Sequence, residues 1–525
     1  GEWFPAFGAG SAAGIFNFGQ RPFSYTPPTG FLSLCTTNTP DPTIADGSKY
    51  FDTIIASGTG ASKTFTMPGG FGPGLVWAKQ RNGATNNALF DVVRGATKRL
   101  VSNANQAEDT QANQLSAFTS DGFTYGSDLP NASGNAGVYW AWDAGSSNTS
   151  ISAGGLNSSV YDQSQTWSGG TTSGSATLSG NGFDKMFNGQ YGSAGQTQSS
   201  GNAILTFTSP ISFNKDTGDT LELIYWETFY VYTSAGTVTL SGGNSANNSF
   251  RDVTSNLPSG SITITGIGVN VTRGMRINGK PLIDSGVSVA NVPTIASTVR
   301  ANSSAGFSIV SYTGNGTNGA TIGHGLSGVE NGMIIVKNRS STVGPWWAVF
   351  HASLTTGKVL GLNSTQGEFD ETYLTRGIIE SVTSSTYSCT AGSAGNQTAN
   401  GNGDTHIAYC FAPVEGYSAF GKYTGNGSSD GPFVFTGFRV AWLLLKRTNG
   451  TGDWFILDSE RNSSNPTDSY LRPNLSNAEA DNTEFVDLLS NGFKIRATGG
   501  AYNGSGVSVV YAAFAEHPFI TARAR

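Results

Sequence analysis

Three segments of the chain carry the same order of apolar runs and glycine turns. Each opens on a Gly turn, continues through a long apolar run that ends in Lys and a shorter aromatic run, and closes on an aromatic-rich run. These elements fall at 57–60, 75–81, 88–91 and 138–142 in the first segment, at 312–316, 334–339, 346–350 and 407–411 in the second, and at 423–427, 442–447, 453–458 and 509–514 in the third. A framework that repeats while its polar residues change indicates a folding unit rather than an active site.

The runs are short and bounded by turn residues, which predicts antiparallel β-structure. The run at 75–79, for example, lies between Pro73-Gly74 and Asn82-Gly83. A different unit at 147–300 has alternating runs and a hairpin signal at Asn278-Gly279. The fold class is therefore predicted as all-β, with tandem antiparallel β-sandwich domains of the jelly-roll or lectin-like kind. The best helix candidate is a short one at 105–113.

Composition indicates a globular chain of several domains. A chain of 525 residues exceeds what one core can hold, so roughly three to five domains are expected. Apolar residues make up 37% and charged residues only 12%, which predicts packed cores under a polar, mostly uncharged surface. The net charge is −6 and the basic residues are dispersed, so the sequence predicts no basic patch that would bind nucleic acid. No apolar stretch is long enough to span a membrane.

The first residues carry a second kind of pattern. The chain opens on Gly1-Glu2-Trp3 with no signal-peptide layout, and we expect it to begin within a longer polypeptide. Residues 17–23 read Asn-Phe-Gly-Gln-Arg-Pro-Phe, and 27–31 read Pro-Pro-Thr-Gly-Phe. This segment resembles the closing strands of a SPRY domain in marine bacteriophage structural proteins.

The threefold pattern resembles the repeat that follows SPRY-like domains in tail proteins of marine phages and cyanophages. The shared features are a Tyr-x-Gly-Asn-Gly turn, a strand that ends in Lys, an Asn-Gly-Phe turn and a final aromatic-Ala-aromatic strand. Two copies depart from this pattern. The first has Ser57-Gly58-Thr59-Gly60 in place of the Asn-Gly version of the turn, and the second has Thr386-Tyr387-Ser388 in place of the Asn-Gly-Phe turn. The resemblance implies a fold and a place in a virion, but it specifies no ligand.

These patterns divide the chain into five predicted units. They are the C-terminal part of a SPRY-like β-sandwich at 1–46, repeat 1 at 47–146, an inserted distinct β-sandwich at 147–304, repeat 2 at 305–414 and repeat 3 at 415–525. The connection at 412–416 is short, so repeats 2 and 3 should pack in a fixed relation. Because the inserted unit interrupts the series, we expect a string of modules rather than a continuous solenoid.

No catalytic site is predicted. The four His (His324, His351, His406 and His517) are scattered and no nucleophile elbow accompanies them. A glycosidase needs two carboxylates across a cleft, and the acidic groups available are Glu368, Asp370 and Glu371, then Glu479, Asp481 and Glu484, then Glu108 and Asp109. The last two groups hold corresponding positions in repeats 3 and 1, which a shared turn explains more simply than a duplicated active site.

Cysteine and oxygen ligands give little further chemistry. Three Cys (Cys35, Cys389 and Cys410) are too few for a disulfide framework, although Cys389 and Cys410 could be strand neighbours and otherwise should be small buried residues. No metal site or cofactor is predicted, but loops with Asn402 and Asp404, or with Asp46 and Asp52, could bind Ca²⁺.

One Lys ends the buried run of each copy: Lys79, Lys337 and Lys446. They could contact a receptor or a phosphate. The favoured interpretation is structural, in which each lies along its strand end and pairs with an acid such as Asp91 or Asp458.

Aromatic residues supply the candidate glycan-binding site, through rings that could stack on sugars. The candidates are Trp226, Trp346, Trp347 and Trp454. Neighbouring aromatics such as Trp346 and Trp347 point to opposite faces of a strand, so one should be core and the other exposed or covered by a neighbouring chain.

The sequence therefore predicts a structural protein of a phage virion, not an enzyme. The favoured role is a tail fibre or adhesin that binds host-surface glycans multivalently, alongside other virion proteins, as a homotrimer that covers its edge strands. The alternatives are a capsid decoration or head-fibre protein without a receptor role, and a polysaccharide depolymerase. Recognition is expected where the copies differ, in the loops at 340–346, 385–404 and 461–474.

Overall fold

The fold is built of strands. The computed structural model describes residues 43–153, 162–174, 182–189, 197–242, 250–285, 287, 293–340, 347–370, 377–392 and 398–515. Within these ranges every regular element is a strand or a short 3₁₀ helix, which confirms the all-β class. Residues 105–113 form no helix and instead include the short strand β6 (Asp109–Thr110), so the helix prediction is wrong. Most of the SPRY-like segment, together with Cys35, Trp346 and His517, lies outside the described residues.

Repeat 1 is a sandwich of one larger and one smaller antiparallel sheet. Its strands are β1 (Phe51–Ser57), β2 (Lys63–Thr66), β3 (Leu75–Gln80), β4 (Ala88–Asp91), β5 (Lys98–Val101), β7 (Leu115–Phe118), β8 (Gly122–Tyr125) and β9 (Ala136–Trp142). The larger sheet has the order β1-β9-β3-β4-β5-β6 and the smaller sheet the order β2-β8-β7.

Repeats 2 and 3 have the same plan. Repeat 2 contains β19 (Phe307–Thr313), β20 (Ala320–Gly323), β21 (Met333–Asn338), β22 (Trp347–His351), β23 (Leu360–Gly361), β24 (Ile379–Val382), β25 (Thr386–Cys389) and β26 (Thr405–Phe411). Repeat 3 contains β27 (Ser418–Thr424), β28 (Phe433–Phe435), β29 (Val440–Arg447), β30 (Trp454–Asp458), β31 (Thr467–Tyr470), β32 (Ala480–Leu489), β33 (Gly492–Ile495) and β34 (Ser508–Ala515). The order β1-β9-β3-β4 recurs as β19-β26-β21-β22 and as β27-β34-β29-β30.

The strand register fixes which residues are equivalent. Phe123 lies opposite Phe65, Tyr387 opposite Ile322, and Phe493 opposite Val434. Tyr387 therefore occupies the place of the Phe in the Asn-Gly-Phe turn, as the sequence pattern predicts. Short 3₁₀ helices join the strands at η2 (Gly47–Lys49), η3 (Trp167–Gly169), η4 (Phe183–Lys185), η6 (Lys215–Thr217), η7 (Thr254–Asn256) and η8 (Val329–Asn331).

The central strands of each larger sheet are buried on both faces. All six residues of β3 are buried. Its alternating side chains enter two different cores, since Val76 and Ala78 pack against the smaller sheet of repeat 1 while Leu75 and Trp77 belong to a second cluster. Burial on both faces explains why these strands are continuous apolar runs rather than alternating ones.

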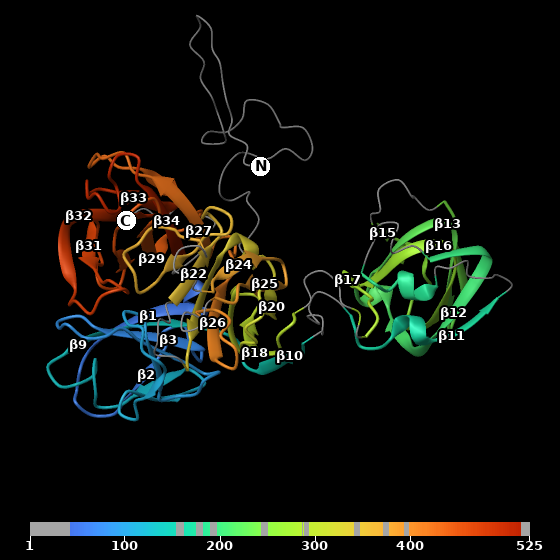
Figure 1. Cartoon of the computed structure of the whole chain (residues 1–525), viewed down its shortest axis with the longest axis horizontal. Coiled ribbons are helices and arrows are strands. Elements are labelled where there is room, and N and C mark those ends of the chain that lie inside the picture. The colour runs from blue at the N-terminus through green and yellow to red at the C-terminus, as the bar shows by residue number, and fades with distance from the viewer. Residues whose placement is uncertain are drawn as a thin grey trace, which may run out of the picture.

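The second cluster is shared by all three repeats. Trp142 of repeat 1 lies 6.2 Å from Phe411 of repeat 2 and 5.4 Å from Trp442 of repeat 3, measured between ring centroids. Phe411 in turn lies 5.7 Å from Phe514 of repeat 3. Figure 1 shows the repeats grouped around one centre. The repeats therefore form one body, as expected for repeats 2 and 3, and the expectation of a string of separate modules is wrong.

The inserted unit leaves and rejoins at one sheet edge. Strands β10 (Asn148–Ile151) and β18 (Ser297–Asn302) pair with each other, and β18 pairs with β19, so both extend the larger sheet of repeat 2. The predicted boundaries at 147 and 304 thus assign to the insertion two strands that belong to the sheet of repeat 2. The turn predicted at Asn278-Gly279 is present, with both residues at positive φ.

Between those strands the chain forms a separate antiparallel sheet around its own apolar core. It contains β11 (Thr171–Gly174), β12 (Thr197–Phe213), β13 (Leu221–Thr233), β14 (Gly236–Leu240), β15 (Arg251–Asp252), β16 (Ile262–Ile277) and β17 (Lys280–Pro281). Register shifts interrupt the pairing of its three long strands, β12, β13 and β16, and such irregularities bend a sheet. This sheet lies to the side of the three repeats in Figure 1.

A buried Asn holds the Gly turn of each repeat. Asn131, Asn400 and Asn503 are at most 1% exposed. Their Oδ1 atoms accept from the backbone N–H between the two glycines of the turn, at Thr59, Asn315 and Asn426. The second Gly of each turn has a φ of 65–73°, a conformation that favours glycine. The turns can be recognised from the sequence, but the asparagines cannot, because they follow the turns at a long distance along the chain.

Candidate functional site

The three buried lysines link neighbouring repeats. Each donates from Nζ to a backbone carbonyl oxygen of another repeat: Lys79 to Ser476 at 3.3 Å, Lys337 to Asn105 at 3.4 Å and Lys446 to Thr365 at 3.1 Å. Repeat 1 thereby contacts repeat 3, repeat 2 contacts repeat 1, and repeat 3 contacts repeat 2, which closes a ring. The predicted pairing with Asp91 or Asp458 is wrong, since Arg94 and Arg461 occupy those carboxylates.

Burial makes these amines weak bases. It lowers the pKa of Lys79 to about 8, and the pKa values of Lys337 and Lys446 to about 7. All three side chains are fully buried, so a receptor or phosphate has no access to them. The favoured structural interpretation stands, although the lysines bond to carbonyl oxygens rather than to acids.

The predicted carboxylate groups also lie between repeats. The backbone N–H of Glu108 donates to the carbonyl of Arg339, that of Glu479 to Arg81, and that of Glu368 to Thr448. These three glutamates are thus equivalent, including the Glu368 group that the sequence pattern left unmatched.

Two of these glutamates bind a pair of arginines each. The side chain of Glu108 binds Arg94 and Arg339, and that of Glu479 binds Arg461 and Arg81. Within the described residues these carboxylates neutralise arginines at an interface, whereas a glycosidase pair faces an open cleft. Glu371 and the side chain of Glu484 are outside the described residues.

A buried ion pair marks repeats 1 and 3. Asp91 binds Arg94 and accepts from the Tyr409 hydroxyl at 2.8 Å. Asp458 binds Arg461 and accepts from Trp140 Nε1 at 2.9 Å. In repeat 2 the register places His351 at the position of the Asp, and Leu354 stands three residues later, where the other repeats have Arg. His351 Nε2 lies 3.0 Å from the Tyr511 carbonyl oxygen. At this position the contact from repeat 2 to repeat 3 is therefore neutral, whereas the contacts made by repeats 1 and 3 involve a buried ion pair.

The tryptophans predicted to bind glycans are mostly unavailable. Trp347 and Trp454 are at most 2% exposed, and their indole N–H groups donate to the carbonyls of Val101 and Gly361 in neighbouring repeats. The prediction is wrong for these two, because the covering surface is another repeat of the same chain. Trp226 is half-buried with the Arg273 guanidinium 4.3 Å from its ring centroid.

The remaining candidates are structural. His324, His351 and His406 are buried, and burial lowers the pKa of His324 and His351 to about 4. Cys389 and Cys410 are buried in the core of repeat 2, as the small-apolar alternative predicts. Burial raises the pKa of Cys410 to about 12, which leaves its thiol inert. No group of three His, Cys, Asp or Glu that could hold a metal occurs among the described residues.

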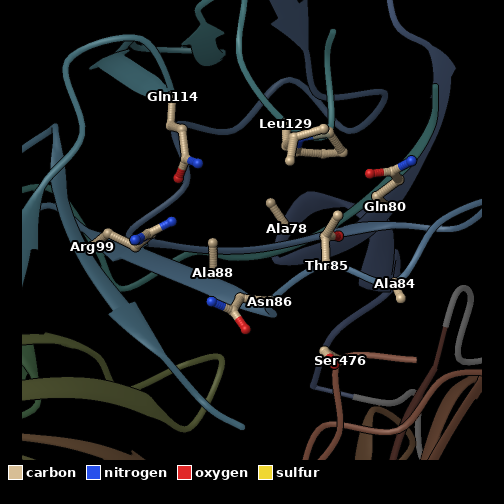
Figure 2. Close-up of a pocket in the computed structure, with 11 residues that line it drawn as sticks. Ala78, Gln80, Ala84, Thr85, Asn86, Ala88, Arg99, Gln114, Leu129 and Ser476 are labelled. Carbon is tan, nitrogen blue, oxygen red and sulfur yellow. The ribbon is translucent and has the colours of Figure 1, made fainter. Parts of the chain in front are cut away.

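A polar hollow of about 350 Å³ lies in repeat 1. Gln80 comes from β3, Ala88 from β4, Arg99 from β5, and Gln114 directly precedes β7. Figure 2 shows these side chains around the hollow, with Ser476 of repeat 3 at its border. The rim reaches solvent at Ala84 and Asn86, while Ala78, Gln80, Ala88 and Gln114 are buried.

Two buried acceptors in this hollow have no hydrogen-bond partner within the part of the chain that the structure describes. They are Oε1 of Gln80 and Oε1 of Gln114, on side chains that are 7% and 4% exposed. The amide of Gln80 is oriented by its Nε2, which donates to Asn82 and Asn135, so that its oxygen lies on the other side. Buried acceptors are normally paired, and their free energy improves when a donor enters.

The same position in the other repeats is filled by core residues. The register equates Ala88, Arg99 and Gln114 of repeat 1 with Phe455, Tyr470 and Phe485 of repeat 3. Pro130 and Tyr502 are equivalent because each directly precedes the buried Asn that holds the Gly turn. The four rings of repeat 3 form one aromatic cluster with centroid distances of 4.1–5.6 Å. Repeat 2 has Ala348, Val359, Ile378 and Ala399 there, all of them buried and the last three in its apolar core. Repeat 1 thus has a hollow where repeats 2 and 3 have buried apolar or aromatic residues.

The chain belongs to a family described as a domain of unknown function (DUF7483), whose model matches residues 46–218 and 235–518. The match starts at repeat 1 and ends just after β34, so one family unit takes in all three repeats. No curated protein matches the chain, and no solved structure does. No described helix is long and apolar enough to cross a membrane.

Proposed function

We propose that this protein is a structural component of a tailed-phage virion, with an adhesive role as a tail fibre or tail-associated module that binds host-surface glycans. The observation that carries the proposal is the packing of three like β-sandwiches around one aromatic core within one chain. Such a body is a rigid scaffold, and its loops are polar with few charges, as the composition of the whole chain is. Rigid presentation of polar loops suits multivalent binding of uncharged glycans.

A binding role is favoured over catalysis. The carboxylates of Glu108 and Glu479 and the three buried lysines are all used in contacts between repeats. We propose that any homotrimer joins surfaces outside the shared core, because the three repeats already cover one face of each larger sheet within the chain.

The position of the chain in intact phage particles tests this proposal. Immunogold labelling or a particle reconstruction should place the chain on the tail. A position on the capsid lattice would replace the adhesin with a decoration or head-fibre protein, and absence from the particle would contradict a virion role altogether.

Incubation with purified host polysaccharides separates binding from hydrolysis. The protein should bind without shortening the polymer. Shortening that is lost in Glu368→Gln would contradict the proposal and favour a depolymerase.

A further inference from the structure

We propose that the polar hollow of repeat 1 binds a single neutral sugar residue of a glycan chain. This inference rests on the proposed adhesive function and names the ligand class of one site. It follows from three properties of the hollow: its charge, its unpaired acceptors and its apolar floor.

The hollow offers no net charge to a ligand. The only charged side chain in its lining is Arg99, whose Nε and Nη2 bind both oxygens of Asp109 at 3.0 and 2.5 Å. Lys79 lies behind the wall, where its amine donates to the carbonyls of Gln80, Gly83 and Ser476. A phosphate or carboxylate would have to compete with Asp109 for Arg99, so a neutral ligand is favoured.

The unpaired acceptors favour a ligand that carries hydrogen-bond donors. Gln80 and Gln114 line the hollow, and their unpaired Oε1 atoms would accept a hydrogen bond from a sugar hydroxyl that reaches them. Leaving a buried acceptor unpaired is unfavourable, and a ligand hydroxyl removes that penalty on binding. The side chains of Thr85 and Asn86 at the rim add groups that both donate and accept.

The rest of the lining suits the C–H surface of a sugar ring. Ala78, Ala88, Leu129 and Pro130 present small apolar surfaces between the polar groups. A volume of about 350 Å³ lies at the small end of ligand pockets, which run from about 300 to 1,000 Å³, so it suits one small ring. The exposed rim at Ala84 and Asn86 leaves room for the glycan to continue into solvent.

Ligand-observed NMR on the full chain tests the site, with galactose, glucose, mannose and N-acetylglucosamine as probes and glucose 6-phosphate as the charged comparison. At least one neutral sugar should show saturable binding that exceeds that of glucose 6-phosphate. Gln114→Ile, which copies Ile378 of repeat 2, should weaken binding about tenfold through the loss of one hydrogen bond. Ala88→Phe, which copies Phe455 of repeat 3, should abolish it.

Ser116→Ala is the matched control, since this exposed residue lies two positions from Gln114. It should bind as the unchanged protein does. Circular dichroism of each variant shows that it is folded, and Gln114→Ile remains informative if Ala88→Phe does not fold. The inference is overturned if no neutral sugar binds, or if one binds the unchanged protein and the folded variants equally.

A glycan array separates this site from the adhesive function as a whole. If the protein binds glycans and Ala88→Phe binds them equally, the adhesin proposal stands and the hollow is not its site. If the protein binds no glycan, the sugar site is overturned, and the location of the chain in the particle still decides its virion role.

Discussion

Repeats 1 and 3 place four equivalent side chains in the same region of the same sandwich and use them in opposite ways. Repeat 3 fills the region with rings, of which Phe485 and Tyr502 are closest at 4.1 Å between centroids. Repeat 1 has Gln114 and Pro130 at those positions and leaves a hollow with unpaired polar atoms. The strands around both regions pair in the same order. The comparison shows that this framework tolerates a packed core and an open polar site at one position, because neighbouring repeats buttress the other face of the larger sheet.

The largest expected effect comes from giving repeat 3 the residue of repeat 1. Phe485→Gln removes a fully buried ring and buries an unpaired amide among aromatic neighbours. The ring accounts for about 3–5 kcal/mol and the amide adds to it, so the free energy of unfolding should fall by about 5 kcal/mol. Urea denaturation measures it. A loss below about 1 kcal/mol would mean that the aromatic cluster does not stabilise repeat 3.

Repeats 1 and 3 each contain a buried Asp–Arg ion pair at the same position, and repeat 2 lacks it. Arg461→Leu copies Leu354 and leaves the Asp458 carboxylate buried without its cation. Removal of one partner from a buried pair costs about 3–5 kcal/mol. His351→Phe in repeat 2 breaks a neutral link and should cost only about 1–2 kcal/mol. Equal losses in the two variants, measured by urea denaturation, would contradict the distinction between charged and neutral links.

Much of this framework could be predicted from sequence, because Gly turns and Lys-ending strands recur at regular spacing. The place of Tyr387 is one example. The shared core could not be predicted, since an apolar run such as 75–78 reads the same whether a sheet, another repeat or another chain covers it. The hollow was missed for a different reason: Gln114 and Phe485 precede Phe123 and Phe493 at different distances, so only strand register shows that they are equivalent.

Overfilling repeat 2 provides a control for the open region of repeat 1. Ala348 is equivalent to Ala88 and is buried, and the core residues Val359 and Ile378 occupy the positions that border the hollow in repeat 1. Ala348→Phe should therefore strain that core and lower the free energy of unfolding by about 1–3 kcal/mol. Unchanged stability in a urea titration would mean that repeat 2 also has room, and the hollow would not distinguish repeat 1.

A smaller effect is expected at the buried lysines that all repeats share. At pH 7, Lys337→Met should leave stability unchanged or raise it, because an apolar chain replaces an amine that folding partly deprotonates. The pKa of Lys337 is about 7 in the folded protein and near its usual value in the unfolded chain. The unfolded state therefore binds more protons above pH 7, and stability should rise from pH 7 towards pH 10.

Thermal melts between pH 7 and 9.5 measure this rise. The window stops there because buried tyrosines such as Tyr312 and Tyr387 have raised pKa values, so their titration lowers stability at higher pH. Lys337→Met should flatten the slope. An unchanged slope in this variant would contradict the lowered pKa of Lys337.

The most direct test of the comparison is the free energy of unfolding of Ala88→Phe, measured by urea denaturation beside the unchanged protein. If repeat 1 has a hollow where repeat 3 has Phe455, the added ring enters existing space. The free energy of unfolding should then stay within about 1 kcal/mol of its original value. A loss of about 3 kcal/mol or more would show that the region is already filled, and would contradict the claim that repeat 1 is the open copy.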